Sequence, residues 1–358
     1  MTGVPVCLAD VARAAHDRLS TEVWDFVEGA SGDERGLAAN RAALDAVSLV
    51  PRMLTGLTEA DPSTRLLGTA ATFPVAVAPM AYQRLLHDDG ELAAARAARD
   101  LGVPFTISTL SSVSIEDIAG TGAALWFQLY WLRDRGAVLD LVRRAEQAGV
   151  SALVVTVDVP IMGRRLRDLR AGFSLPPHVT AANLAGDPAR TANPMVTVAE
   201  HTRLAFAPAL SWSDLAWLRE RTELPLVLKG ILDATDAELA VRAGAAGVVV
   251  SNHGGRQLAG AVPSVTALPW VVDAVDGQCE VLLDSGIRSG TDILRAVALG
   301  ASGVLVGRPV LHGLAAGGTG GVAAVLEILR AELAAEMLLA GCGDVASAGR
   351  LATVGPPV

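Results

Sequence analysis

The sequence has few cysteines, and no pattern joins them. Its three cysteines, Cys7, Cys279 and Cys342, are odd in number and far apart, and no Cys-x-x-Cys pair is present. This spacing predicts neither a disulfide framework nor a zinc site, and it is typical of a protein in a reducing cytoplasm. We therefore expect a cytoplasmic protein without a metal centre.

Long apolar runs and blocks of basic residues are absent too. No apolar stretch reaches the roughly 18 residues needed to span a bilayer. The first residues lack the basic and apolar regions that mark a signal peptide. The formal net charge is −9 and no basic cluster stands out, which argues against a nucleic-acid partner. These absences favour an enzyme that is neither membrane-bound nor a nucleic-acid binder.

A repeated alternation of strand-like and helix-like segments fills most of the chain. With 358 residues, 51% of them hydrophobic, the chain is long enough for one large α/β barrel or two smaller domains. The eight apolar runs are Val75–Ala78, Phe105–Ser108, Leu125–Leu129, Ala152–Val157, Leu226–Lys229, Val248–Ser251, Val281–Asp284 and Val304–Gly307. Stretches with helical spacing between them include Glu91–Leu101, Ala137–Ala148, Asp236–Ala243 and Thr291–Leu299.

Eight such repeats predict an α/β fold of the (β/α)8 TIM-barrel type, with parallel strands and crossover helices. An open, doubly wound sheet is the alternative. It is disfavoured because Ala78-Pro79-Met80-Ala81 stands where a glycine-rich dinucleotide fingerprint would follow the first strand.

The flanking segments complete one domain over residues 1–358. Residues 1–60 are expected to form an N-terminal helical extension, with helices at Leu8–Leu19 and Thr21–Glu28 and a helix or a turn into a strand at Asn40–Val50. Residues 70–340 would form the barrel. Residues 173–211 are a long insertion after strand four, rich in Ala, Pro, Asn and Thr, and predict a mobile loop. His178 and His201 in it are interpreted as structural or solvated.

Polar or special residues stand at the carboxyl end of nearly every expected strand. In chain order they are Pro79, Ser108, Gln128, Tyr130, Thr156, Asp158, Lys229, Ser251, His253, Asp284, Gly307 and Arg308. A TIM barrel carries its active site on this rim. A histidine can exchange a proton near neutral pH, and an arginine such as Arg256 matches a carboxylate. One such residue alone would be unremarkable in a loop, but the whole series predicts a catalytic site.

The last two rim segments predict a phosphate site. Asp284–Gly290 follows strand seven and Gly307–Pro309 follows strand eight, and barrels often bind phosphate with these two loops. Ordinary strand-to-helix turns are the alternative. Arg288 and Arg308, each beside a glycine-containing turn, favour phosphate.

These motifs together resemble the FMN-dependent α-hydroxy acid oxidase and dehydrogenase family over almost the whole chain. Ser251–Leu258, reading SNHGGRQL, is similar to the family's active-site signature. The other similar stretches are WDFVEGASGDE at 24–34, WFQLYW at 126–131, TVDVPIMGRRLRD at 156–168, LKGI at 228–231, DSGIRSGTDIL at 284–294 and GRPV at 307–310. Within the family, residues 81–87 and 108–114 most resemble the members that oxidise 4-hydroxymandelate in aryl-glycine antibiotic biosynthesis.

The resemblance implies roles for the reacting groups. His253 would be the active-site base, and Asp158 would orient it and stabilise its charged form. Arg165 and Arg256 would bind the substrate carboxylate. Tyr130 would hydrogen-bond the substrate's hydroxyl or keto oxygen.

It also implies FMN as cofactor. Lys229 would lie at the N1 and O2 edge of the flavin, where its charge stabilises the reduced anion. The ring contacts would be Pro79, Met80, Ala81, Ser108, Gln128, Thr156 and Ser251. The ribityl and phosphate contacts would be Asp284, Ser285, Gly286, Ile287, Arg288, Gly307 and Arg308.

Two departures from the family pattern bear on the site. Phe26 stands where many members have a tyrosine that touches the substrate carboxylate, and with Tyr82, Leu110 and Met162 it predicts an apolar, aromatic pocket. A side chain that only fills the core is the alternative for Phe26. Ser285 replaces a common glycine, which raises the question of backbone strain.

The expected reaction is oxidation of an (S)-2-hydroxy acid, 4-hydroxymandelate or mandelate, to the 2-keto acid, with O2 reduced to H2O2. The alternatives are a dehydrogenase with another electron acceptor, an oxidase of lactate or glycolate, a flavin-binding protein without turnover, and a sugar-phosphate enzyme without flavin. The resemblance further implies a homotetramer.

Overall fold

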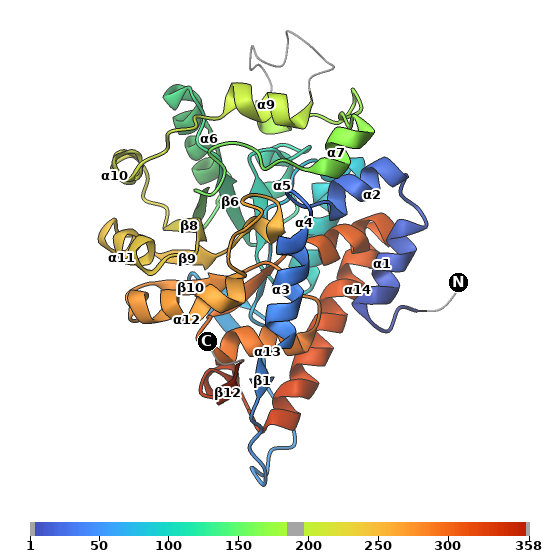
Figure 1. Ribbon diagram of the computed structural model, residues 1–358, viewed down its shortest axis with the longest axis vertical. Coiled ribbons are helices and arrows are strands. Elements are labelled where there is room, and N and C mark those ends of the chain that lie inside the picture. The colour runs from blue at the N-terminus through green and yellow to red at the C-terminus, as the bar shows by residue number, and fades with distance from the viewer. Residues whose placement is uncertain (1–3, 185–196, 356–358) are drawn as a thin grey trace.

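The chain folds around a closed barrel of eight parallel strands, seen nearly side-on in Figure 1. The computed structural model describes residues 4–184 and 197–355. The barrel strands are β4 (Val75–Val77), β5 (Phe105–Ser108), β6 (Leu125–Leu129), β7 (Leu153–Thr156), β8 (Leu226–Ile231), β9 (Gly247–Val250), β10 (Glu280–Leu283) and β11 (Gly303–Val306). Each pairs with the next along the chain, and β11 pairs with β4 to close the ring. The predicted (β/α)8 barrel is confirmed.

The strands form because their residues are apolar and buried on both faces, as parallel barrel strands require. Alternate side chains such as Trp126, Val154 and Val249 fill the barrel interior. A hairpin of β2 (Thr64–Leu66) and β3 (Thr69–Ala71) places the fully buried Leu66 in the same cluster. The interior is therefore a packed core, and any site must lie at its rim.

Several strands end one residue earlier than the sequence pattern predicts. Ser251, Asp284 and Gly307 were included in strands, yet β9, β10 and β11 stop just before them. The N–H groups of Ser251 and Asp284 still donate to Ile231 O and Val250 O of the neighbouring strands, at 3.3 Å and 3.1 Å, so the ladder ends at these residues and the loops of the rim begin there. The difference of one residue places their side chains in the site instead of the sheet.

Helices cover the outside of the barrel. They are α4 (Glu91–Asp100), α5 (Ile115–Ala119), α6 (Arg135–Gln147), α10 (Trp212–Arg219), α11 (Ala234–Arg242), α12 (Ser264–Val275), α13 (Gly290–Ala298) and α14 (Arg308–Ala340). Short polar side chains at their amino ends accept backbone N–H bonds, as Ser289 does for Asp292 in α13. The remaining short elements are η1 (Gln83–Leu85), α15 (Val345–Ala348), β1 (Ser48–Leu49) and β12 (Thr353–Val354).

The N-terminal extension is helical, as expected, and packs on the barrel. It contains α1 (Leu8–His16), α2 (Thr21–Glu28) and α3 (Arg35–Asp45). Ser20 caps α2 by accepting from the Val23 N–H. The predicted element at Asn40–Val50 is the second half of α3 followed by β1, which pairs with β12. In Figure 1, α1 lies along α14, and α2 lies beside α7 (Leu166–Ala171) near the carboxyl ends of the strands.

The insertion after strand four carries more regular structure than a mobile loop would. Its described parts include η2 (Ala182–Leu184) and α9 (Val198–Ala205), while residues 185–196 of the predicted loop lie outside the described residues. Helix α9 forms because Thr197 caps its start and Val198, His201, Thr202 and Ala205 bury one face. None of the helices described is long and apolar enough to cross a membrane.

Candidate active site

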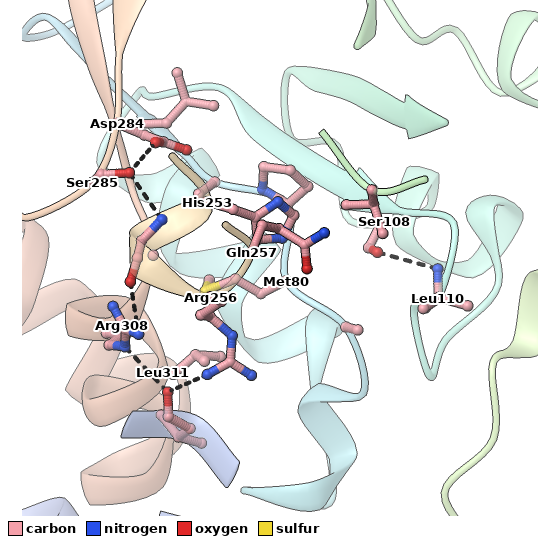
Figure 2. Close-up of a pocket in the computed structure, with 18 of the residues that line it drawn as sticks. Met80, Ser108, Leu110, His253, Arg256, Gln257, Asp284, Ser285, Arg308 and Leu311 are labelled. Atoms are coloured by element: carbon pink, nitrogen blue, oxygen red, sulfur yellow. Dashed lines mark hydrogen bonds between the residues drawn. The ribbon is translucent and has the colours of Figure 1, made fainter. Parts of the chain in front are cut away.

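A cavity opens at the carboxyl ends of the barrel strands, and residues at or within three positions of all eight strand ends line it. The predicted site residues that line it are Phe26, Pro79, Met80, Ala81, Tyr82, Ser108, Tyr130, Met162, Arg165, Lys229, His253, Arg256, Asp284, Ser285, Gly286, Ile287, Arg288, Gly307 and Arg308. Figure 2 shows a close-up of this pocket. Side chains that are far apart in the sequence therefore meet in one place.

His253 and Asp158 form a close pair at the rim. The His253 Nδ1 atom lies 3.0 Å and 3.2 Å from the two carboxylate oxygens of Asp158. His253 begins the short helix η3 (His253–Gly255) directly after β9, in the left-handed region at φ 58°. A Cβ atom at Gly230 would lie 2.6 Å from the Asp158 Cβ, so only glycine leaves room for this carboxylate.

The pair is tuned to keep the histidine neutral and the aspartate charged. Burial lowers the pKa of His253 below its ordinary 6.5, although Asp158 acts in the opposite direction. Burial opposes ionisation of Asp158, but the His253 charge and hydrogen bond and the charge of Lys229 lower the pKa of the carboxyl. A neutral imidazole beside a carboxylate can accept a proton and have the resulting charge stabilised.

Lys229 is a buried cation held by two partners. Its Nζ atom lies 2.9 Å from a carboxylate oxygen of Asp284 and donates to the Ser251 hydroxyl at 3.0 Å. Burial disfavours the charge, yet Asp284 and Asp158 raise the Lys229 pKa. Ser251 in turn accepts from the His253 N–H at 3.0 Å. His253 is thereby linked through Ser251 to the Lys229–Asp284 ion pair.

Ser285 closes this network from the other side. Its hydroxyl donates to Asp284 at 2.6 Å and accepts from the Gly254 N–H at 2.9 Å, as Figure 2 shows. Its φ of 78° lies in the left-handed region, so the strain anticipated where serine replaces glycine is present. These contacts form one closed ring. It runs from Lys229 to Asp284, to Ser285, to the Gly254 N–H, through the backbone of His253 to Ser251, and back to Lys229.

Two arginines lie near the base and differ in their partners. The Nε atom of Arg165 has no hydrogen-bond partner among the residues that the structure describes, and its nearest carboxylate is Asp168 at 3.9 Å. Arg256 donates to the backbone carbonyls of Phe26 at 3.0 Å and Val27 at 3.1 Å, at the carboxyl end of α2. Burial, with the like charges of Arg165 and Arg308, lowers the pKa of Arg256 well below its ordinary value.

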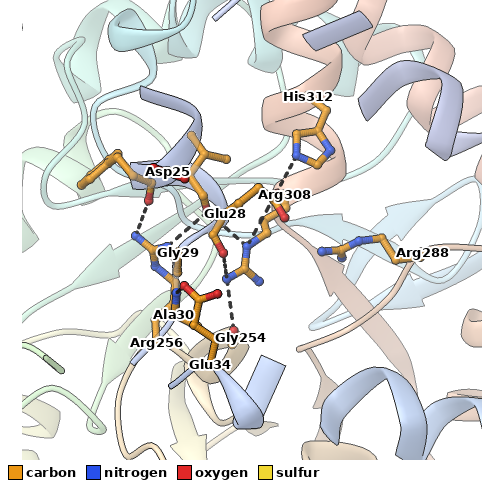
Figure 3. A network of polar contacts seen from close by, with 12 residues as sticks. Asp25, Glu28, Gly29, Ala30, Glu34, Gly254, Arg256, Arg288, Arg308 and His312 are labelled. Carbon is orange, nitrogen blue, oxygen red and sulfur yellow. Dashed lines mark hydrogen bonds and ion pairs between the residues drawn. The ribbon is translucent and has the colours of Figure 1, made fainter. Parts of the chain in front are cut away.

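A second pair of arginines, Arg288 and Arg308, also lines the cavity, and Arg308 lies beside Arg256 because both donate to the Val27 carbonyl. Arg308, the first residue of α14, donates to Val27 O at 3.1 Å and to Gly254 O at 3.2 Å (Figure 3). Burial and the charge of Arg308 lower the pKa of Arg288 to about 10. Burying two cations against one cavity is costly unless an anion joins them.

Glu28 supplies part of that negative charge. It lies 3.9 Å from Arg308 Nε and 2.8 Å from His312 Nε2. Burial opposes its ionisation, but the His312 hydrogen bond and the Arg308 charge lower the Glu28 pKa to about 2. Glu34 and Asp284 also act on Arg308, and Asp292 acts on Arg288, yet burial keeps the pKa of both arginines below its ordinary value. The carboxylates therefore do not fully offset the cost of burying these two charges.

A model of the FMN-dependent dehydrogenase family matches residues 15–353 of this sequence. The chain belongs to that family. It is 59% identical to 4-hydroxymandelate oxidase of Amycolatopsis orientalis, over 97% of this chain and 98% of that protein. It is 46% identical to L-lactate oxidase of Nostoc sp., over 95% of this chain and 96% of the other. Among solved structures, mandelate oxidase with (S)-4-hydroxymandelic acid is similar at a TM-score of 0.94 and 58% identity, covering 99% of this chain and 100% of that one.

The match to the FMN-dependent dehydrogenase family confirms FMN as the cofactor, and the residues that line the cavity suit its charged groups. The buried and incompletely compensated charges of Arg288 and Arg308 suit a phosphate, with the amino end of α14 beside it. A Cβ atom at Gly254 would lie 3.0 Å from Arg308 Nη1, so a residue larger than glycine would crowd the Arg308 guanidinium. The buried Lys229 offers a cation toward the same cavity.

Three residues expected to touch the flavin ring do not line the cavity. The Gln128 amide oxygen accepts from the Ser108 hydroxyl at 3.2 Å, and its nitrogen donates to the Thr156 hydroxyl at 2.9 Å. Ser251 holds Lys229 and His253, as described above. These residues support the ones that face the cavity, and their direct contact with FMN stays a prediction.

The end of the cavity beyond the base is apolar. Phe26 stacks on Phe173, with ring centroids 4.6 Å apart, and Tyr130 stacks on Phe206 at 4.5 Å. Burial and the Asp158 charge raise the pKa of Tyr130 to about 12, so its hydroxyl keeps its proton at neutral pH.

Sequence reasoning missed one wall of this pocket. Val198, Thr202 and Phe206 all line the cavity and come from α9 and the residue after it. They stand four residues apart, the spacing that places side chains on one face of a helix. That spacing was readable in the sequence, but the Ala, Pro and Asn content of the insertion favoured a loop.

Proposed function

We propose that this protein is an FMN-dependent oxidase of aryl (S)-2-hydroxy acids. It would convert 4-hydroxymandelate or mandelate to the 2-keto acid, 4-hydroxybenzoylformate or benzoylformate, and reduce O2 to H2O2. The observation that carries the proposal is the meeting of Arg165 and the His253–Asp158 pair with an apolar, aromatic pocket. The names of the relatives, 4-hydroxymandelate oxidase and mandelate oxidase, support the same substrate class.

Arg165 is the main carboxylate ligand in this proposal. Its buried guanidinium has an unsatisfied Nε–H, and a planar fork of donors matches a carboxylate. Arg256, which lines the same cavity, adds a second positive charge. Because Arg256 also donates to the carbonyls that end α2, it ties the substrate's carboxylate site to the position of Phe26.

His253 is the base. Asp158 occupies Nδ1, which leaves Nε2 as the nitrogen that takes the proton. Oxidation removes two hydrogens and two electrons from the hydroxy acid, and His253 accepts one proton whether the α-hydrogen leaves as a proton or as a hydride. Bound FMN supplies the two-electron acceptor, and O2 finally takes the electrons as H2O2.

Tyr130 and the pocket wall orient the substrate. With its pKa near 12, Tyr130 stays protonated and can donate to the substrate's hydroxyl or keto oxygen. Phe206, stacked on Tyr130, together with Phe26, Tyr82, Leu110 and Met162, favours an aryl group over the hydrogen or methyl of glycolate or lactate.

An anaerobic visible spectrum tests the proposal. The purified, FMN-loaded protein is mixed with (S)-mandelate, (S)-4-hydroxymandelate, lactate or glycolate, and then with air. Bleaching by the aryl acids with rapid return of colour in air is the expected result. Bleaching without return would favour a different electron acceptor, and bleaching only by lactate or glycolate would refute the aryl substrate. The His253→Asn variant should keep its flavin but not bleach.

We also propose a homotetramer, which the family resemblance implies, and a cytoplasmic location, which the cysteine pattern favours. The exposed apolar residues Met53 and Leu54 in the loop after β1 are consistent with a surface covered by another copy. Light scattering coupled to gel filtration would give the mass directly.

A further inference from the structure

The face of α9 that borders the cavity carries a single hydroxyl group. Val198, Thr202 and Phe206 are 8%, 5% and 4% exposed, and all three line the cavity. Two of these side chains are apolar, so a polar group between them calls for a reason.

The Thr202 hydroxyl is arranged to accept a hydrogen bond. Its Oγ1 atom donates its proton to the Val198 carbonyl at 2.9 Å, within α9. No described residue donates to this oxygen in return, so its lone pairs are available. A ligand group that met it would therefore have to be a donor.

Thr202 is related to the reacting centre through Phe206. Phe206 stacks on Tyr130, which lines the same cavity as His253. Thr202 precedes Phe206 by four residues, so the two residues are separated by about one helical turn, ~5.4 Å, along the helix axis. A phenyl ring held beside Tyr130 and Phe206 would direct its para substituent along this wall toward Thr202.

The nearby alternative is less suited to this task. The Tyr82 hydroxyl lies 3.5 Å from His201 Nδ1 and is already directed at that ring. The other side chains expected at this end, Leu110 and Met162, are apolar.

We propose that Thr202 determines specificity by accepting a hydrogen bond from the para-hydroxyl of a 4-hydroxyaryl substrate. The inference rests on the proposed function, because it assumes that an aryl 2-hydroxy acid occupies the cavity. It predicts that the protein binds 4-hydroxymandelate and its keto acid more tightly than the unsubstituted compounds, and that Thr202 causes the difference.

Thr202→Val tests this, because valine has nearly the same shape and no hydroxyl. Dissociation constants of benzoylformate, 4-fluorobenzoylformate and 4-hydroxybenzoylformate are measured for the FMN-loaded protein by the perturbation of its visible spectrum. The three keto acids are reaction products or analogues of them, so their dissociation constants can be measured without turnover. The preference for the 4-hydroxy compound over the other two should fall about 3- to 10-fold, the value of one neutral hydrogen bond.

Thr202→Ser is the matched control, since it keeps the hydroxyl and should keep the preference. Thr202→Ala is compared with Thr202→Ser if the valine variant does not fold. Equal preference in the wild-type, Val and Ser proteins would overturn the role of Thr202 while leaving the proposed function intact. Failure of every aryl acid to bleach the wild-type flavin would overturn the proposed function and this inference with it.

Discussion

Replacing Asp158 by asparagine isolates the charge that faces the catalytic histidine. Asparagine has the same shape, so it fits beside Gly230 and can still accept from Nδ1. At the 3.0 Å separation of Oδ1 and Nδ1, the simple Coulomb attraction at an effective dielectric constant of about 20 is somewhat more than ~4 kcal/mol. The net effect of the charge on the pKa is smaller than this attraction. Opposite charges at such distances move a pKa by about 1–3 units, or ~1.4–4 kcal/mol. We therefore expect flavin reduction at saturating (S)-mandelate to slow about 10- to 1,000-fold at pH 8.

The pH dependence gives this prediction its sign. The working base is neutral His253, so activity is lost as pH falls through its pKa. Asp158 raises that pKa against the effect of burial, so removing its charge should move the acid limb of the rate profile to lower pH. Anaerobic stopped-flow reduction from pH 5 to 9 measures both effects. Asp168→Asn is the control, because that carboxylate faces Arg165 and should leave the acid limb in place. A slowing of less than about 3-fold, or an acid limb that moves upward, would refute the reasoning.

Three further predictions concern the groups around the base. Glu28→Gln should lower the free energy of unfolding by about 3 kcal/mol at pH 7, because folding lowers the Glu28 pKa from 4.5 to about 2. Denaturant titrations should show that the difference between the two proteins shrinks as pH falls below 4.5, and a constant difference would contradict this prediction. Arg256→Lys keeps the positive charge, but a lysine cannot donate to all the carbonyls of α2 simultaneously. The variant should therefore have a free energy of unfolding lower by about 2–4 kcal/mol and a higher KM for mandelate, and an unchanged denaturation curve would count against this. Ser285→Ala and Ser285→Gly both lose two hydrogen bonds, but glycine adopts the left-handed φ without strain. The Gly variant should therefore be more stable than the Ala variant by about 0.5–1 kcal/mol, and the opposite order in chemical denaturation would show that strain at this position is negligible.

Much of the barrel and its rim was predictable because the signals are local. A buried parallel strand reads as a short apolar run, and the residue that follows it lies on the rim wherever the barrel closes. That rule alone brought His253, Lys229 and Asp284 to one cavity. It misplaced strand ends by one residue, since a run of apolar letters does not show where the hydrogen-bond ladder stops.

What could not be predicted depends on contacts between distant segments. Nothing near Arg256 indicates that its guanidinium donates to carbonyls more than 200 residues earlier in the chain. The contribution of α9 was missed for a related reason, because composition suggested a loop and the neighbour that orders Phe206 is Tyr130, which follows β6 in a distant part of the chain. Long-range partners decide both features.

The attachment of α2 to Arg256 and Arg308 has a consequence for synthesis of the protein on the ribosome. The carbonyls at the end of α2 precede their arginine partners by 227 to 281 residues. At the usual 5–20 residues per second, the nascent N-terminal helices wait on the order of 10–50 s before those partners have been made. During that interval α1 has no α14 to cover its apolar face. This N-terminal segment is thus among the last to dock, and a chaperone that shields it co-translationally would raise the yield of active enzyme.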